Sequence, residues 1–226
     1  MFMKVFDRAS LLGRIGVAAS DDLLHWRYDR IVLSEPFDLG YPHVVEDAGD
    51  VYLLPDTETT QRVVLYRAEG FPHDWVHVAD LLAGRPFRSP TVFRRDDHWW
   101  LFTQTHEDHT DPVLRLYHAG TLTGPWQEHP ASPVVRGDSP VVRPAGRVIE
   151  HDGQLLRLGR FHANEHATQV CAARITKLSP TEYAEEPMVN RPVMQTEPGS
   201  WMSNRLHHLD IHSLPEGRYV SSIDAR

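Results

Sequence analysis

A unit that returns about every 50 residues constrains the fold of this chain more than any other feature. In each copy a proline opens an apolar strand, a charged turn leads into an aromatic strand, and a third strand and a tryptophan follow. Pro42 opens the first copy and Pro90 opens the second, 48 residues later, while Trp75 and Trp126 lie 51 residues apart. A third copy, which starts at Pro144, is looser in spacing but keeps the order. Four-stranded modules at a fixed period are typical of propeller blades, so we predict an all-β propeller.

Both ends of the chain carry fragments of the same unit. Residues 13–20 and 26–32 match a third and a fourth strand, and residues 206–212 and 219–223 match a first and a second strand. An open ring would leave unpaired strand edges that promote aggregation. We therefore expect the C-terminal pair to join the N-terminal strands in one composite blade, or a second copy of the chain to cover the surplus edge in a homodimer. Residues 1–8 also match a second strand, which is one strand more than four blades need. The number of blades is therefore either four or five.

Composition favours a single domain over residues 1–226. A chain of this length with 41% hydrophobic residues can form one sizeable core and is short for two. No run of 18 apolar residues is present, and the N-terminus lacks a secretory pattern, so we expect a cytoplasmic protein without a membrane partner. A net charge of −8 without a basic cluster argues against nucleic acid as a partner. The lone Cys171 lies in an apolar strand, where it is expected to fill the core.

Two irregular stretches are dense in histidine and acidic residues. Residues 105–112 include His106 and His109, and residues 161–168 include His162 and His166. The His106-x-x-His109 spacing suits a metal, but neither cysteine partners nor a helix accompany it. We interpret both stretches as solvated polar loops, with a functional site as the alternative, and predict no metal. The pattern identifies no cofactor.

Five segments resemble, in the same order, successive parts of one known propeller domain; they cover residues 34–56, 89–103, 116–130, 143–158 and 207–210. That domain precedes the transferase module in plant glucosamine inositolphosphorylceramide transferases. It is similar in turn to the five-bladed propellers of glycoside hydrolase family 43. The resemblance extends over nearly the whole chain from Lys4 onward and implies the propeller fold.

The resemblance also implies where carboxylates would stand in a hydrolase. Those propellers place a base, an acid and a third carboxylate at the starts of three inner strands, and an inverting pair must leave room for a water. Here the segment for the first carboxylate has no counterpart, Ser89 precedes the second inner strand, and Arg143 stands before the third. We therefore predict that the chain does not hydrolyse ordinary arabinosides or xylosides.

The inner-strand starts carry other side chains that suit ligand binding. Arginine grips hydroxyls, carboxylates or phosphates, tyrosine offers a flat face to a sugar, and a histidine beside an acid can act as a base. We predict one channel-mouth pocket with the catalytic residues His43, His207 and Glu46 and the substrate-binding residues Tyr41, Arg88, Ser89, Arg143, Arg147 and Arg205. In the alternative interpretation the histidines are structural, and Arg143 and Arg147 clamp neighbouring blades through Glu150.

Three functions follow from this pattern. We favour a biosynthetic protein that binds a sugar or polar metabolite in the channel and transforms it by non-hydrolytic acid–base chemistry of histidine and arginine. The second is a non-catalytic carbohydrate-binding or scaffold propeller. The third is a divergent inverting glycosidase that uses displaced carboxylates such as Glu46 and Asp138.

Overall fold

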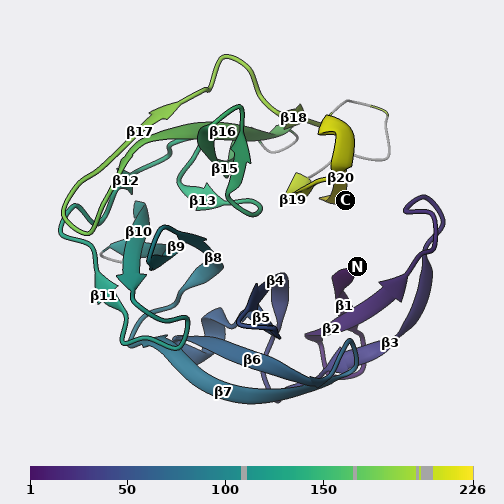
Figure 1. Cartoon of the computed structure of the whole chain (residues 1–226). Coiled ribbons are helices and arrows are strands. Elements are labelled where there is room, and N and C mark those ends of the chain that lie inside the picture. Colours follow the sequence, from purple (N-terminus) through teal and green to yellow (C-terminus); the bar gives the residue numbers. More distant parts are fainter. Residues whose placement is uncertain (108–110, 165–166, 197–198, 200–205, 226) are drawn as a thin grey trace. The chain divides into compact units, whose positions relative to one another are not determined.

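The computed structural model describes residues 1–107, 111–164, 167–196, 199 and 206–225 (Figure 1). These residues form twenty β-strands and two short 3-10 turns, and they include no α-helix. Consequently, no helix in this part of the chain is long and apolar enough to span a bilayer. The chain divides into two compact units, residues 1–90 with 119–126 and residues 91–118 with 127–226.

The first unit contains two antiparallel sheets. The three-stranded sheet has the order β1-β2-β3, with β1 at Phe2–Asp7, β2 at Leu12–Ala19 and β3 at Arg27–Leu33. The four-stranded sheet has the order β4-β5-β6-β7, with β4 at Gly40–Asp47, β5 at Asp50–Asp56, β6 at Arg62–Gly70 and β7 at Asp74–Ala83. The 3-10 turn η1, Glu58–Thr60, connects β5 to β6.

The second unit contains most of three further sheets. The first has the order β11-β10-β9-β8, with β8 at Arg88–Arg95, β9 at His98–Glu107, β10 at Asp111–Ala119 and β11 at Gln127–Glu128, and β12 at Val135–Arg136 also pairs with β10. The next has the order β13-β15-β16-β17, with β13 at Arg143–Pro144, β15 at Gln154–Asn164, β16 at Ala167–Leu178 and β17 at Tyr183–Pro187. Strand β14, Ile149–His151, pairs with β15, and β18, Met194–Gln195, pairs with β16. The last is the hairpin of β19, Leu206–Ser213, and β20, Tyr219–Ala225, with the 3-10 turn η2, Pro215–Gly217, between them.

The predicted repeat is confirmed by the strand order. Each of the three longer sheets starts with a proline-containing strand and pairs its strands in chain order. The turns between the first and second strands contain residues with positive φ, including Ala48 at 52°, Asp96 at 53° and Asp152 at 48°. Positive φ is typical of the tight turns that match the twist of a hairpin.

The recurring tryptophans have a common structural role. Trp26, Trp75 and Trp126 each donate the indole N–H to a backbone carbonyl three or four residues earlier in the chain. The acceptors are the carbonyls of Leu23, Pro72 and Leu122, at 3.2, 3.0 and 3.1 Å. This bond satisfies the donor of a large ring and fixes the turn before the outer segment of each copy, which explains why tryptophan recurs with the period.

Apolar residues from successive strands form a separate core in each unit. The core of the first unit contains Ile15, Leu33, Leu39, Leu53, Val64 and Tyr66. Two clusters of the second unit contain Trp100, Phe102, Leu114, Leu116, Val142 and Ile175, and Ala145, Leu158, Val170, Ala172, Leu206 and Leu209. Cys171 is fully buried with Val141 and Ala173, as predicted for a core filler.

The terminal strands form where they were predicted, and residues 1–8 contribute β1 as the additional strand. In the described pairing, β1-β2-β3 and β19-β20 are separate sheets of the two units. The composite blade and the homodimer that would cover a surplus edge therefore stay predictions.

Candidate ligand-binding site at the inner-strand ends

The starts of β4 and β8 share an unusual backbone conformation. Tyr41 and Ser89 each precede a proline and have φ values of 44° and 51°. Residues with a side chain seldom adopt this region, and the proline that follows restricts them further. Local strain of this kind persists only where the surrounding structure enforces it, and it clusters at functional sites. The first unit thus carries two strained positions at inner-strand starts that the sequence had identified as ligand-binding.

A carboxylate is bound to the start of β8, although none is present there in the sequence. Asp56, the last residue of β5, accepts the backbone N–H of Ser89 through Oδ2 at 2.8 Å and that of Glu58 through Oδ1 at 3.1 Å. Glu58 in turn forms an ion pair with Nε of Arg88 at 2.5 Å. Arg88 is therefore neutralised by a neighbouring acid, and Asp56 and Glu58 hold the start of β8 to the β5–β6 connection.

The two predicted catalytic residues of β4 are separated by the strand. His43 is only 2% exposed, whereas Glu46 is exposed beside the turn between β4 and β5. Residues three positions apart in a strand point to opposite faces and lie about 10 Å apart along it. The strand does not bring Glu46 beside the ring of His43, and the displaced acid Asp138 is likewise exposed in a turn.

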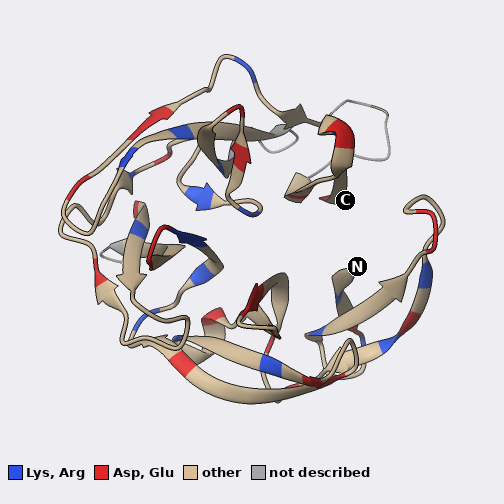
Figure 2. Cartoon of the chain, in the orientation of Figure 1, with Lys and Arg blue, Asp and Glu red and all other residues tan. Residues whose placement is uncertain are grey.

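In the second unit, two arginines and a histidine gather at the end of the third blade. Arg143 of β13 pairs in register with Arg160 of β15, and Nη1 of Arg160 lies 2.7 Å from Nδ1 of His207 in β19. Arginine has no acceptor atom, so Nδ1 must accept this hydrogen bond, and the ring proton of neutral His207 must lie on Nε2. Figure 2 shows the basic colour on β13. The result is a cationic cluster next to a neutral imidazole that can donate from Nε2.

Arg147 has the clamping role that was the alternative interpretation. It binds Asp210 of β19 in a bidentate pair, with Nε to Oδ1 at 2.7 Å and Nη2 to Oδ2 at 2.9 Å. Burial alone would raise the pKa of Asp210, but hydrogen bonds from His212 and Arg147 hold it far below its usual value. The predicted partner of Arg147, Glu150, was wrong, because Glu150 pairs with Arg95 at 2.8 Å. The pair ties the segment after β13 to the C-terminal hairpin.

His208 follows His207 but has a different environment. Burial lowers its pKa to about 4, and the nearby Arg147 and Arg160 act in the same direction against Asp210. His208 is therefore neutral at ordinary pH.

The structure brings together some of the predicted residues and leaves others untested. Arg160, a site residue that sequence reasoning missed, lies opposite Arg143 in the register of β13 and β15 and contacts His207. Arg205 lies outside the described residues, as do His109 and His166 of the histidine-rich stretches. The pocket that would combine Tyr41, His43 and Arg88 with the second-unit residues involves both units and stays a prediction.

Several solved structures that share this fold are glycosidases. An endo-arabinase from Bacteroides thetaiotaomicron matches with a TM-score of 0.68 over 98% of this chain and 87% of that protein, at 16% identity. A Bombyx mori family 32 β-fructofuranosidase matches with a TM-score of 0.67 over 96% of this chain and 50% of the other, at 15% identity. An α-L-arabinofuranosidase from Clostridium thermocellum gives 0.65 over 93% and 71%, at 13% identity. At such identities the likeness shows the fold alone, and that fold is the β-propeller of these glycosidases.

The sequence identifies the family more narrowly. Residues 1–226 match the family described as "Glucosamine inositolphosphorylceramide transferase 1, N-terminal", and the chain belongs to this family. Glucosamine inositolphosphorylceramide transferase 1 of Oryza sativa subsp. japonica is 30% identical over 99% of the chain, and that of Arabidopsis thaliana is 26% identical over 99%. The chain spans only 31% and 30% of the length of these relatives.

Proposed function

We propose that this propeller serves carbohydrate biosynthesis by binding a sugar or polar metabolite with an anionic group, without hydrolysing it. The observation that carries the proposal is the cluster of Arg143, Arg160 and His207, which joins two cations to a neutral imidazole at one blade end. Charge-assisted hydrogen bonds from arginine suit phosphates and carboxylates.

Each side chain of the cluster has a different role in the proposed binding. Arg143 and Arg160 provide positive charge and N–H donors for the anionic group, and His207 donates from Nε2 to a ligand oxygen. Acid–base chemistry at His207 would use Nε2, because Arg160 occupies Nδ1. The name of the relatives makes an amino sugar and a phosphorylated polyol the ligands to test first.

A second candidate is a non-catalytic binding or scaffold propeller. Two ion pairs at blade ends favour it, because they use predicted site residues for structure. These pairs are Arg147 with Asp210 and Arg88 with Glu58. Binding without turnover of any ligand in the panel would select this candidate over the catalytic one.

Calorimetric titration with glucosamine, glucosamine 6-phosphate, myo-inositol and myo-inositol 1-phosphate tests the proposal. We expect the phosphorylated ligands to bind more tightly than their neutral counterparts. Arg143→Gln and Arg160→Gln should each weaken that binding by about tenfold to a hundredfold, the range for a hydrogen bond to a charged group. Arg191→Gln, which changes an exposed arginine of the same unit, should leave it unchanged. Equal affinity of wild type and both cluster variants, with all variants folded, would contradict the proposal.

A further inference from the structure

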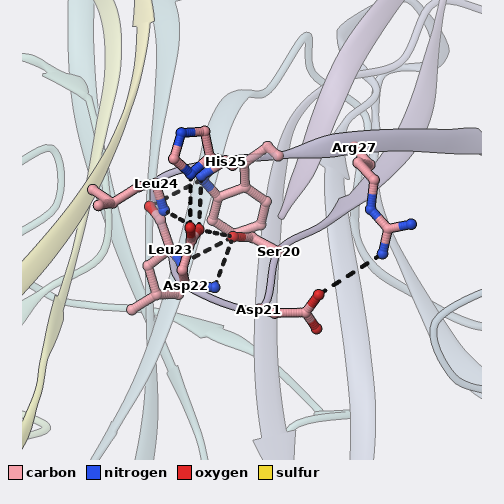
Figure 3. Close-up of polar contacts among 8 residues, drawn as sticks. Ser20, Asp21, Asp22, Leu23, Leu24, His25 and Arg27 are labelled. Carbon is pink, nitrogen blue, oxygen red and sulfur yellow. Dashed lines mark hydrogen bonds and ion pairs between the residues drawn. The ribbon is translucent and has the colours of Figure 1, made fainter.

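The loop between β2 and β3 exposes large apolar side chains. In this β2–β3 tip, residues 20–26, Leu23 is 44% exposed, Leu24 is 79% exposed and Trp26 is 37% exposed. In Figure 3 the side chains of Leu23 and Leu24 point away from the polar contacts of the loop. Isolated exposed leucines are common, but adjacent ones beside an exposed tryptophan form a patch that requires an explanation.

The internal repeat separates what is structural in this loop from what is not. Trp26 is explained by the repeat, because Trp75 and Trp126 make the same indole bond. The two positions that hold Leu23 and Leu24 are occupied by Pro72 and His73 in the next copy, and by Thr123 and Gly124 in the one after. The leucine pair is therefore particular to this loop and is not needed to build the turn.

Four successive backbone amides of the tip, those of residues 22–25, are satisfied within the loop. Ser20 Oγ accepts the N–H groups of Asp22 at 3.3 Å and Leu23 at 2.9 Å, and Asp22 Oδ1 accepts those of Leu24 at 2.9 Å and His25 at 2.8 Å. Asp22 Oδ2 lies 2.7 Å from Nδ1 of His25 (Figure 3). These amides do not depend on water for hydrogen bonds. A backbone segment can enter an apolar medium only if its amides have such acceptors.

Leu23 is also held in a conformation that leucine avoids. Its φ is 63°, in the left-handed region, where a bulky side chain is strained. The bonds of its amide to Ser20 and of its carbonyl to Trp26 keep it there. Strain that is maintained in this way is more typical of a functional element than of a solvated loop.

Side-chain character changes in a definite order away from the tip. Leucines at the apex are followed along the chain by the aromatic rings of Trp26 and Tyr28, the latter 53% exposed, and by Arg27 and Arg30. Each arginine pairs with an aspartate of the same segment, Arg27 with Asp21 at 3.9 Å (Figure 3) and Arg30 with Asp29 at 3.2 Å. Where a protein element enters a membrane interface, apolar residues at its tip are followed by aromatic and basic residues.

We propose that the β2–β3 tip inserts Leu23 and Leu24 into the interfacial region of a lipid bilayer. The aromatic rings then lie at headgroup depth, and the ion pairs of Arg27 with Asp21 and of Arg30 with Asp29 stay in the aqueous headgroup layer. The Asp22 carboxylate, held by Ser20, His25 and two amides, limits entry to the leucine side chains. This peripheral contact departs from the expectation of a protein without a membrane partner and is independent of the proposed ligand site.

Sedimentation with phosphatidylcholine vesicles tests this proposal, using wild type and the double variant Leu23→Asn, Leu24→Ser. Asparagine tolerates positive φ, so the loop should keep its backbone. Removing two inserted leucines should weaken partitioning at least about tenfold. Binding should persist at about 0.5 M salt, since insertion is not screened as headgroup attraction is.

Leu11→Asn is the matched control. Leu11 is 70% exposed with φ of 59° in the turn at the other end of β2, so its loss removes a similar exposed leucine away from the tip. The control should bind vesicles as wild type does. Absence of wild-type sedimentation, equal binding of the double variant, or equal loss in the control would each overturn the proposal. Self-association that depends on the leucine pair, without vesicle binding, would assign the tip to a protein contact instead.

Discussion

At the scale of single residues, His208 links the site to acid stability. Its folded pKa of about 4 lies below the ordinary histidine value of 6.5, so the unfolded chain takes up a proton first as the pH falls. The stability due to neutral His208 is fully present above pH 6.5 and is lost between pH 6.5 and about 4. We expect a loss of about 2 to 3 kcal/mol across this window, the size that the lowered pKa of the buried ring implies. Urea unfolding at several pH values measures it, and His208→Gln should flatten the profile in this window; an unchanged slope would contradict the assignment.

Arg147 and Asp210 should contribute to folding rather than to ligand binding. Arg147→Ala leaves a mostly buried carboxylate without its bidentate partner, so we expect a loss of about 2 to 4 kcal/mol in the free energy of unfolding. Ligand affinity measured below the melting temperature should change little. Arg147→Lys, which keeps the charge but not the planar fork, should recover only part of the stability. A variant with wild-type stability and lost ligand binding would place Arg147 in the site after all.

Individual site residues were predictable where the repeat placed them. Arg143 was found because it directly precedes the proline that opens a copy, and His207 because it lies at the start of the C-terminal strand pair. Arg160 lies toward the end of a second strand, where the copies carry different residue types and the repeat offers no signal; Asp56, at the end of another second strand, was recognisable as an acid near the pocket, but its partner was not. The register of β13 with β15 reveals Arg160, and the hydrogen bond to the amide of Ser89 reveals the partner of Asp56.

At the scale of elements, the third copy is irregular for a steric reason. Its first strand is interrupted between β13 and β14, where Gly146 adopts φ of 154°. A Cβ at this glycine would lie 2.0 Å from the carbonyl oxygen of Leu209, and the amide of Leu209 donates to the Ala145 carbonyl at 2.8 Å. The backbone of β19 thus approaches this point closely, and only glycine leaves room for it.

Gly146→Ala should therefore be among the most damaging small substitutions. We expect a loss of at least about 2 kcal/mol in the free energy of unfolding, because the methyl group meets backbone that cannot move aside. Thermal unfolding measures the loss. Gly137→Ala, at a glycine with φ of 70° but no atom within 4 Å of the added Cβ, isolates the backbone contribution. Equal losses in the two variants would show that the close approach of β19 is not the cause.

Strand order and turn chemistry were readable from the sequence, because alternating apolar residues and turn signals are local. Closure by a composite terminal blade stays a prediction, since pairing between distant segments depends on contacts that no local pattern records. The tryptophan period was recognised from the sequence, but its cause, the indole bond to an upstream carbonyl, was visible only in the structure.

At the scale of the whole molecule, the chain shares the propeller fold with glycosidases. It does not carry carboxylates at the inner-strand starts where the resemblance to family 43 leads us to expect them. Ser89 and Arg143 stand at two of them, and the carboxylate nearest to Ser89, Asp56, uses both oxygens on backbone amides. An inverting mechanism needs a base and an acid on opposite faces of the sugar. We expect no release of nitrophenol from nitrophenyl arabinosides, xylosides or galactosides. Turnover that disappears in Glu46→Gln, Asp56→Asn or Asp138→Asn would restore the glycosidase hypothesis.

Ligand binding at the second-unit cluster is tested most directly by a crystal structure of the chain with the tightest-binding phosphorylated ligand of the titration panel. The predicted result is ligand density within hydrogen-bonding distance of Arg143 and Arg160, with Nε2 of His207 facing a ligand oxygen. Density confined to another part of the molecule, or a ligand-bound cluster in which neither arginine contacts the anionic group, would contradict the proposed function.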